Sequence, residues 1–204
     1  MDLILVRHGE SLGNVVDYDC HDPELTDIGV RQAHMLAKRL EKESFDYVLC
    51  SPLIRALDTA WIVCLGRDHK PEVHMNLREV RGLEKRVGLS KKALEERFPG
   101  IGLMDESLDC NEGWIDPGDE SREMGYNRAK NMVDYIKNRF TGDERVLVVA
   151  HGTFNGLFIS ALLGLDYTNN IRFGQHNTCL NGFHFENNQC KVLYLNDKGH
   201  LQSS

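Results

Sequence analysis

The chain lacks any apolar stretch long enough to cross a bilayer, and its first residues carry neither a basic segment nor a long hydrophobic one. It also lacks an excess of positive charge, since 31 acidic residues against 24 basic ones leave a formal net charge of -7. Such a chain has no overall basic field to attract nucleic acid or an acidic membrane surface. We therefore expect a soluble cytoplasmic protein with no nucleic-acid and no membrane partner.

The six cysteines lack the spacing of a metal site or a disulfide framework, because no Cys-x-x-Cys motif occurs among them. Cys179 and Cys190 flank a predicted hairpin. A two-residue turn at 187–188 would place Cys190 opposite Phe185, so we expect these thiols to stay reduced. The histidines outside the motifs described below also lack metal-ligand spacing, and no metal or cofactor is expected.

Two short apolar runs end in the same dipeptide, His-Gly. The run Leu3–Val6 leads through an arginine to His8, and the run Val146–Ala150 leads directly to His151. Buried parallel strands would deliver both histidines to the carboxyl edge of one sheet, where open α/β folds place their ligands. The pair therefore predicts a functional site at that edge.

Two arginines add charge to the predicted edge. Arg7 stands directly before the first of the two histidines, and Arg55 follows the apolar run Tyr47–Cys50. A guanidinium group matches the oxygens of phosphate or carboxylate bidentately. The combination predicts a site for an anion.

Strand and helix signals alternate along the chain, which implies a three-layer α/β/α sandwich with a mainly parallel sheet and an antiparallel edge strand. We expect a single domain over 1–204, in which the charged, glycine-punctuated segment of about 78–119 forms a lid. The apolar runs predict strands at about 3–6, 47–50, 72–75, 146–150, 179–186 and 189–194. The helical spacing of apolar residues predicts helices at about 26–43, 53–65, 90–98, 118–140 and 153–163.

Four sequence boxes together resemble the histidine phosphatase superfamily, also called phosphoglycerate mutase-like. They are Leu5 to Ser11 with Asn14 following, Leu25 to Ala33, Ser51 to Ala60, and Val149 to Gly152, in the expected order. The resemblance spans residues 3 to 164. It implies a small phosphomonoester as substrate and a phosphohistidine intermediate, without metal or cofactor.

The resemblance also implies roles for particular residues. His8 would be the nucleophile, while Arg7 and Arg55 grip the phosphoryl oxygens and His151 donates to them in the transition state. Glu79 would protonate the leaving oxygen and later activate water. The residues expected to bind substrate are Arg7, Asn14, Arg55, His151 and Gly152, with backbone amides after His151 as a further anion site.

Some assignments have an alternative. The Gly-x-Trp-Glu-Gly continuation usual in the family is absent after Glu79, so Glu84 is a second candidate for the acid. Asn14 can be an ordinary turn residue. Thr153 can cap the helix after the second His-Gly motif or face the phosphate.

A basic cluster near the candidate acid also has two interpretations, either a contact with a second anionic group of the substrate or an exposed charged turn. It consists of Arg78, Arg81, Lys85 and Arg86. Glu120 and Ser121 can line the pocket or serve the start of the next helix.

The pocket motifs favour a phosphatase over a mutase. The Trp-Asn, Gly-Trp-x-Asp and Asn-Glu-Arg-x-Tyr-Gly segments typical of cofactor-dependent phosphoglycerate mutases are absent, and these segments set specificity. A catalytically silent relative that binds a phosphorylated ligand is the alternative of another class. It is disfavoured because a pure binder needs no nucleophile together with a leaving-group acid.

Overall fold

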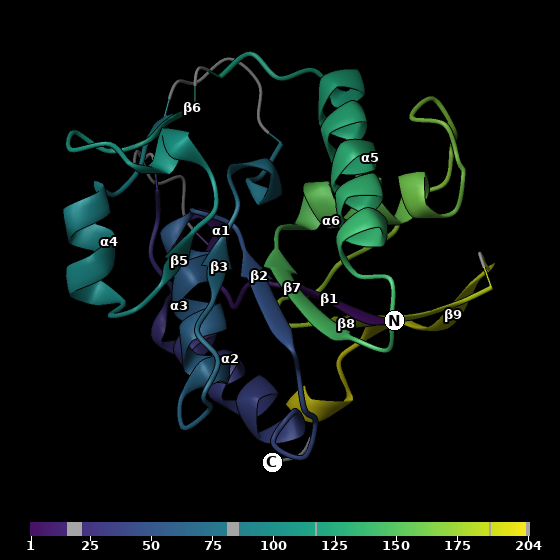
Figure 1. The fold of residues 1–204 in the computed structure, drawn as a ribbon, viewed down its shortest axis with the longest axis horizontal. Helices are drawn as coiled ribbons and strands as arrows, with labels where there is room; N and C mark the ends of the chain where they lie inside the picture. The colour runs from purple at the N-terminus through teal and green to yellow at the C-terminus, as the bar shows by residue number, and fades with distance from the viewer. Residues whose placement is uncertain (16–21, 81–85, 117, 188, 203–204) are drawn as a thin grey trace.

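The computed structural model describes residues 1–15, 22–80, 86–116, 118–187 and 189–202. Its main sheet has seven strands in the order β5-β3-β2-β7-β1-β8-β9 (Figure 1). The first five in this order run parallel, and β8 and β9 each run antiparallel to their neighbours. The bounds of these strands are β1 Asp2–Arg7, β2 Tyr47–Cys50, β3 Glu72–Val73, β5 Gly102–Leu103, β7 Arg145–Ala150, β8 Leu180–Glu186 and β9 Gln189–Asp197.

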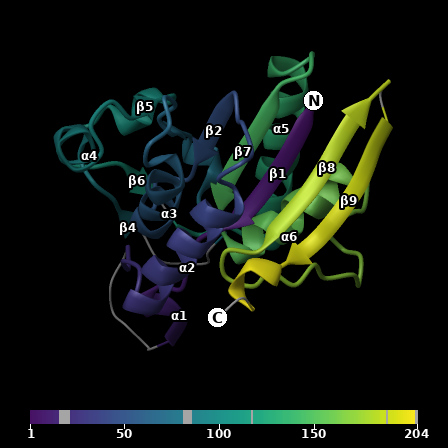
Figure 2. The same cartoon turned by 90° about the horizontal axis from the view of Figure 1, so that it is seen from below.

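Strand β1 occupies the middle of the sheet, between β7 on one side and β8 on the other (Figure 2). Its residues pair with β7 in parallel from Asp2 opposite Arg145 to Arg7 opposite Ala150. The expected mainly parallel sheet with an antiparallel edge is therefore confirmed.

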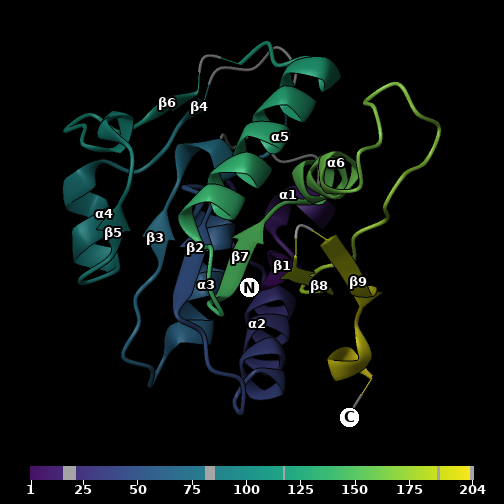
Figure 3. The ribbon, with the colours of Figure 1, turned by 45° about the vertical axis from the view of Figure 1, so that its right-hand side comes forward.

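Helices cover both faces of the sheet, with α2 and α3 on one side and α5 and α6 on the other (Figure 3). Side chains along each strand alternate between the two faces. Ile4 and Val6 of β1 point to the α2 and α3 side, and Leu3 and Leu5 point to the α5 and α6 side. The helices span α1 Leu12–Val15, α2 Asp27–Arg39, α3 Ile54–Cys64, α4 Lys91–Arg97, α5 Arg122–Arg139 and α6 Gly152–Leu162, and 3-10 turns lie at Met75–Leu77, Glu106–Leu108 and Gly199–Leu201.

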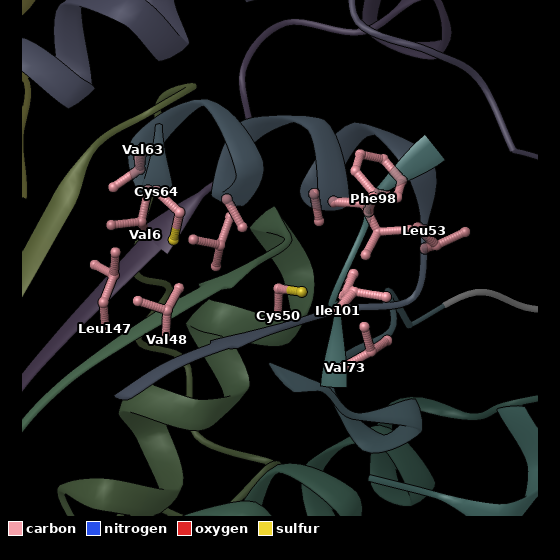
Figure 4. Close-up of a cluster of buried hydrophobic side chains, with 14 of the residues drawn as sticks. Val6, Val48, Cys50, Leu53, Val63, Cys64, Val73, Phe98, Ile101 and Leu147 are labelled. Atoms are coloured by element: carbon pink, nitrogen blue, oxygen red, sulfur yellow. The ribbon is translucent and has the colours of Figure 1, made fainter. Parts of the chain in front are cut away.

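The segment 78–119 contributes to the domain core as well as to its surface. Its strand β5 pairs with β3, and β4 (Arg86–Val87) with β6 (Ile115–Asp116) forms a separate two-stranded sheet. Phe98 and Ile101 pack in the same apolar cluster as Leu53 and Val73 (Figure 4). The prediction of a lid did not include this buried part of the segment. The reason is that strands of two residues are too short to show a hydrophobic periodicity in the sequence.

Helix α2 ends earlier than its periodicity predicts. It stops at Arg39 instead of 43. The guanidinium group of Arg67 donates hydrogen bonds to two backbone carbonyls just after this end, that of Leu40 at 2.5 Å and that of Glu43 at 2.7 Å. Carbonyls at a helix end need partners from outside the helix, and here the guanidinium group supplies them. The third predicted strand is also shorter than expected, since a 3-10 turn begins at Met75.

The hairpin of β8 and β9 has the predicted register, with Cys190 opposite Phe185. Five cysteines lie in the described part of the chain and all are free thiols, and burial raises the pKa of Cys64 and of Cys179 to about 11. Cys20 lies outside the described residues. Among the helices described, none has the length and apolarity that a bilayer crossing requires.

Candidate active site

The two histidines meet at the carboxyl edge of the parallel strands. The backbone amide of His8 donates to the carbonyl of Ala150 at 3.0 Å, which fixes the end of β1 beside the end of β7. The ring centres of His8 and His151 are 5.0 Å apart and the rings are inclined by 58°. Residues 143 positions apart in the sequence thus form one pair, as the two strand endings predict.

His8 is buried and held in one tautomer. Its Nδ1 lies 2.6 Å from the carbonyl oxygen of Gly9, which can only accept, so Nδ1 carries the proton and Nε2 keeps its lone pair. The Nε–H of Arg55 donates to that Nε2 at 3.2 Å. Burial first, and then the charges of Arg55 and Arg7, hold the pKa of His8 well below its usual 6.5. The imidazole is therefore neutral at neutral pH and presents Nε2 as a nucleophile.

The loop that carries this histidine fits closely against the start of α2. A Cβ atom added to Gly9 would lie 2.5 Å from the carbonyl oxygen of Gly29, and one added to Gly29 would lie 1.9 Å from that of Glu10. The amide of Gly9 also donates to Thr59 Oγ1 at 3.1 Å. These contacts exclude side chains at both glycines and fix the backbone next to His8.

The arginines are anchored from different elements. Nη1 of Arg7 donates to the carbonyl of Gln175 at 2.7 Å, and Nη1 of Arg55 lies 3.5 Å from the carboxylate of Asp22. The same carboxylate accepts the amide of Ile54 at 3.0 Å, at the first residue of α3. Burial lowers the pKa of Arg7, while Glu79 and then Cys179 act in the opposite direction. Each guanidinium thus has a fixed orientation before any ligand binds.

Glu79 reaches the start of α6. One carboxylate oxygen accepts the amides of Val80 at 2.8 Å and Phe154 at 2.9 Å, and the other accepts that of Thr153 at 3.2 Å. The expectation that these helix amides form a free anion site is therefore wrong, because the carboxylate of Glu79 occupies them. Thr153 is also not the helix cap; His151 holds that position.

A polar cavity of about 170 Å³ brings five of the seven predicted site residues together: Arg7, His8, Asn14, Arg55 and Glu79. His151 is fully buried and does not line this cavity, and its Nε2 lies 2.7 Å from Ser51 Oγ. Gly152 borders a neighbouring cavity, and a Cβ on it would lie 3.4 Å from Nε of Arg7. A larger cavity of about 500 Å³ lies at the opposite edge of the sheet beside Met1, and none of the predicted residues line it.

Asn14 borders the cavity and also closes a turn. Its Oδ1 accepts the amide of Ser11 at 3.1 Å and the side-chain amide of Asn177 at 3.3 Å. That side chain of Asn177 also donates to the carbonyl of His8 at 3.1 Å, and the amide of Thr178 donates to that of Arg7 at 3.0 Å. The turn role and the pocket position of Asn14 therefore coexist.

The alternative site residues are placed elsewhere or lie outside the description. Arg78 pairs with Asp116 at 3.1 Å and lies 3.8 Å from Glu120, whose main partner is Arg128. Ser121 caps α5. Glu84, Arg81 and Lys85 lie outside the described residues, as does the side chain of Arg86.

Several residues that shape the site have no local sequence signal. Asp22, Gln175 and Asn177 stand in loops and act through contacts with residues far away in the chain. Arg128 lies on a helix whose sequence suggests an exposed, charged face at this position, yet its side chain is buried. Among the described residues, His, Cys, Asp and Glu side chains form no group of three that could hold a metal ion.

A neutral buried histidine, two fixed arginines and a carboxylate around one small cavity define a phosphoryl-transfer enzyme of the three-layer α/β class. The chain belongs to the histidine phosphatase superfamily, branch 1, whose family model matches residues 3–198. The predicted family and fold are confirmed.

Curated relatives agree with this assignment. Phosphoserine phosphatase 1 of Hydrogenobacter thermophilus is 30% identical over 208 residues, which cover 98% of this chain and 93% of that protein. A protein of Yersinia pestis named "Probable phosphoglycerate mutase GpmB" is 31% identical over 170 residues, which cover 81% of this chain and 76% of that protein.

Solved structures of the same fold include phosphoserine phosphatase from Entamoeba histolytica in complex with 3-phosphoglyceric acid. Its TM-score to this chain is 0.71 at 25% identity, with 98% of each chain covered. The prediction of a histidine phosphatase that hydrolyses phosphomonoesters is confirmed, and the mutase alternative has less support.

Proposed function

We propose that this phosphatase works through a phosphohistidine formed on Nε2 of His8. The observation that carries the proposal is the arrangement around this nitrogen. Nδ1–H is committed to the carbonyl of Gly9, and Nε2 lies at a cavity bordered by Arg7 and Arg55. A nucleophile with a fixed lone pair next to two phosphate-binding groups is what an in-line displacement at phosphorus requires.

In the first step the Nε2 lone pair attacks phosphorus, and the bond from phosphorus to the ester oxygen breaks. Arg7 and Arg55 neutralise the phosphoryl oxygens. His151 exchanges its contact with Ser51 Oγ for a hydrogen bond to these oxygens as charge develops. Arg55 leaves Nε2 for the phosphoryl group at this stage. Glu79 gives its proton to the departing oxygen, so that an alcohol leaves.

In the second step water attacks the phosphohistidine. Glu79, now a carboxylate, takes a proton from this water, the bond between nitrogen and phosphorus breaks, and inorganic phosphate leaves. Its position at the border of the cavity supports this assignment, and its bonds to the amides of Val80, Thr153 and Phe154 fix the orientation of the carboxyl group. Asn14 and Gly152 complete the proposed binding set at the borders of the cavity.

We propose that the segment 78–119 frames the leaving-group side, since Glu79 and Val80 from its first residues line the cavity. Phosphoserine is the first substrate to test because two relatives described above carry that activity in their names. We place the reaction in the cytoplasm, where thiols stay reduced, in accord with the free cysteines described above.

To test the proposal, the protein is mixed with phosphoserine or p-nitrophenyl phosphate that carries a radioactive phosphoryl group. The reaction is then stopped rapidly without acid, and acid-labile label bound to the protein is measured. We expect labelling and phosphate release in the wild type, and neither in His8→Ala. His34→Ala, which removes an exposed histidine from α2, is the matched control and retains both. Turnover without any labelled protein would contradict the covalent route.

The role of Glu79 is tested separately with Glu79→Gln, which cannot donate or take the proton. Hydrolysis of phosphoserine should fall by about 10² to 10⁴. The ester p-nitrophenyl phosphate should lose less in the first step, because its leaving group needs little protonation. Transfer of phosphate between the positions of phosphoglycerate, with little release of phosphate, would favour the mutase that the Yersinia relative is named for.

A further inference from the structure

A second cavity adjoins the candidate active site. Its volume is about 210 Å³, and it lies between the first turns of α6, the first residue of α5 and the segment 171–173. Thr153 borders both this cavity and the phosphate cavity. Because the amide of Thr153 donates to Glu79, the shared wall stands next to the proposed proton donor of the leaving group.

Two arginines, Arg122 and Arg172, line the second cavity, and in the described part of the chain their hydrogen-bond partners are backbone carbonyls. Arg122 donates its Nε–H to the carbonyl of Tyr167 at 3.2 Å, and Arg172 donates through Nη1 to the carbonyls of Asn169 and Ile171. These bonds orient both groups and leave other N–H donors of each guanidinium open. Neutral carbonyls do not cancel the charge.

The two guanidinium groups are close enough to repel each other. Burial first, and then the charge of Arg172, lower the pKa of Arg122. Two like charges around one cavity destabilise each other, and an anion between them reverses the sign of that interaction. The other walls are contributed by Leu157, Phe173 and Ser160, which suit a short carbon skeleton with polar substituents.

The backbone links this cavity directly to the phosphate-binding arginine. Arg172 lies three residues before Gln175, whose carbonyl accepts Nη1 of Arg7. On the other side, Gly152 of the second cavity lies against Nε of Arg7. The two cavities therefore share Thr153 as a lining residue, and both adjoin Arg7 at the same edge of the sheet.

The basic cluster considered from the sequence is a weaker candidate for a second anion contact. Of the four residues in this cluster, Arg78 has its side chain in the described part of the chain. That side chain is already paired with the carboxylates of Asp116 and Glu120. A substrate anion would compete with these buried carboxylates there, whereas the hydrogen bonds of Arg122 and Arg172 go to neutral backbone carbonyls.

We propose that the second cavity binds an anionic group on the leaving-group part of the substrate, so that the preferred phosphomonoesters carry a carboxylate or a second phosphate. The inference rests on the proposed function for the position of the leaving group. Arg122 is half-buried and Arg172 is exposed, so Arg122 contributes the larger share because solvent screens it less.

The test compares matched esters that differ in one anionic group. One pair is 3-phosphoglycerate and glycerol 3-phosphate, which differ in a carboxylate, and the other is fructose 1,6-bisphosphate and fructose 6-phosphate. For each ester kcat and KM are measured with the wild type, Arg122→Met, Arg172→Met and the double variant. Arg31→Met, an exposed arginine of α2, is the control.

We expect the wild type to prefer the anion-bearing member of at least one pair. The double variant should lose about tenfold or more of that preference through KM, because it removes both charged donors that would hydrogen-bond to the anion. The pair that responds tells whether the anion is a carboxylate or a phosphate. No preference in either pair, or a preference that the double variant keeps, overturns the proposal.

Calorimetric binding of the same esters to His8→Ala separates this inference from the proposed catalytic route. The dissociation constants of the anion-bearing esters should rise when Arg122→Met and Arg172→Met are added to that background. Binding that responds in this way without turnover in the parent enzyme would contradict the catalytic proposal alone. Binding that is indifferent to both arginines would contradict the second anion site even in an active enzyme.

Discussion

Arg128→Met should lower both the free energy of unfolding and kcat, although residue 128 does not border the phosphate cavity. The guanidinium of Arg128 forms a bidentate pair with Glu120 at 2.6 and 2.7 Å, and it donates to the carbonyls of Asn76 and Arg78 at 2.7 and 2.9 Å. It also lies 4.9 Å from the ring centre of Phe154. Arg128 therefore braces the chain just before Glu79 and the helix turn that holds the carboxylate of Glu79.

The expected loss of stability follows from burial of the pair, since the side chains of Arg128 and Glu120 are only 8% and 7% exposed. Removing one member of a buried ion pair costs about 3–5 kcal/mol, because the other charge stays behind without its partner. Arg78 remains 3.8 Å from Glu120, so we expect the lower end, about 3 kcal/mol. A domain with about 5–15 kcal/mol of stability stays folded after this change.

Urea unfolding followed by circular dichroism measures the stability, and phosphate release from phosphoserine measures kcat. We expect kcat to fall by about tenfold to a hundredfold, because small displacements of a catalytic group have effects of this size. The second variant, Arg128→Met with Glu120→Leu, removes both charges and should regain much of the stability but not the rate.

Arg139→Met is the matched control on the same helix. Arg139 pairs with Glu72 at 2.8 Å, but both side chains are about a quarter exposed, 26% and 23%. We expect a loss of about 1 kcal/mol or less and an unchanged kcat. The reasoning is refuted if Arg128→Met unfolds within about 1 kcal/mol of the wild type, or if kcat stays the same while stability falls.

Two further predictions concern the loop of the nucleophile. Gly29→Ala should lower the free energy of unfolding, measured in thermal melts, by about 1–3 kcal/mol, because the added Cβ meets the carbonyl of Glu10. Gly174→Ala is the control and should change the stability little, since the space around Gly174 is open. Equal melting temperatures of the two variants would contradict the close approach at Gly29. His8, whose pKa lies well below 6.5 in the folded chain, binds its proton more readily when the chain unfolds, so stability should fall as the pH drops below about 6.5. In His8→Asn this part of the slope between pH 5 and 6.5 should flatten, and an unchanged slope would show that other groups cause it.

The strands that carry the candidate site were predictable because each combines an apolar run with an unusual ending. Leu3–Val6 and Val146–Ala150 are too short and too uniformly apolar to be surface segments, and both end in His-Gly. The register of Cys190 opposite Phe185 also followed from local chemistry. Strand β5 did not, since Gly102–Leu103 is defined only by its pairing with β3.

The interior of the site was less predictable because it depends on contacts between distant segments. Glu79 could be placed from the family pattern, but its bonds to the amides of Thr153 and Phe154, 74 and 75 residues away, have no local signal. The same holds for Arg122 and Arg172, which lie 50 residues apart and border one cavity. Periodicity reports which face of a helix is buried and does not report which arginines border the same cavity.

Because β1 lies between two strands that come late in the sequence, the order in which the strands are synthesised differs from the order in which the sheet can assemble. Its partners are β7, which begins at Arg145, and β8, which begins at Leu180. A ribosome therefore makes Arg7 and His8 among the first residues but must produce most of the chain before their strand has a neighbour on both sides. Such long-range pairing slows folding and leaves the nucleophile loop unformed on the nascent chain, so truncated products would carry the nucleophile without its chemistry.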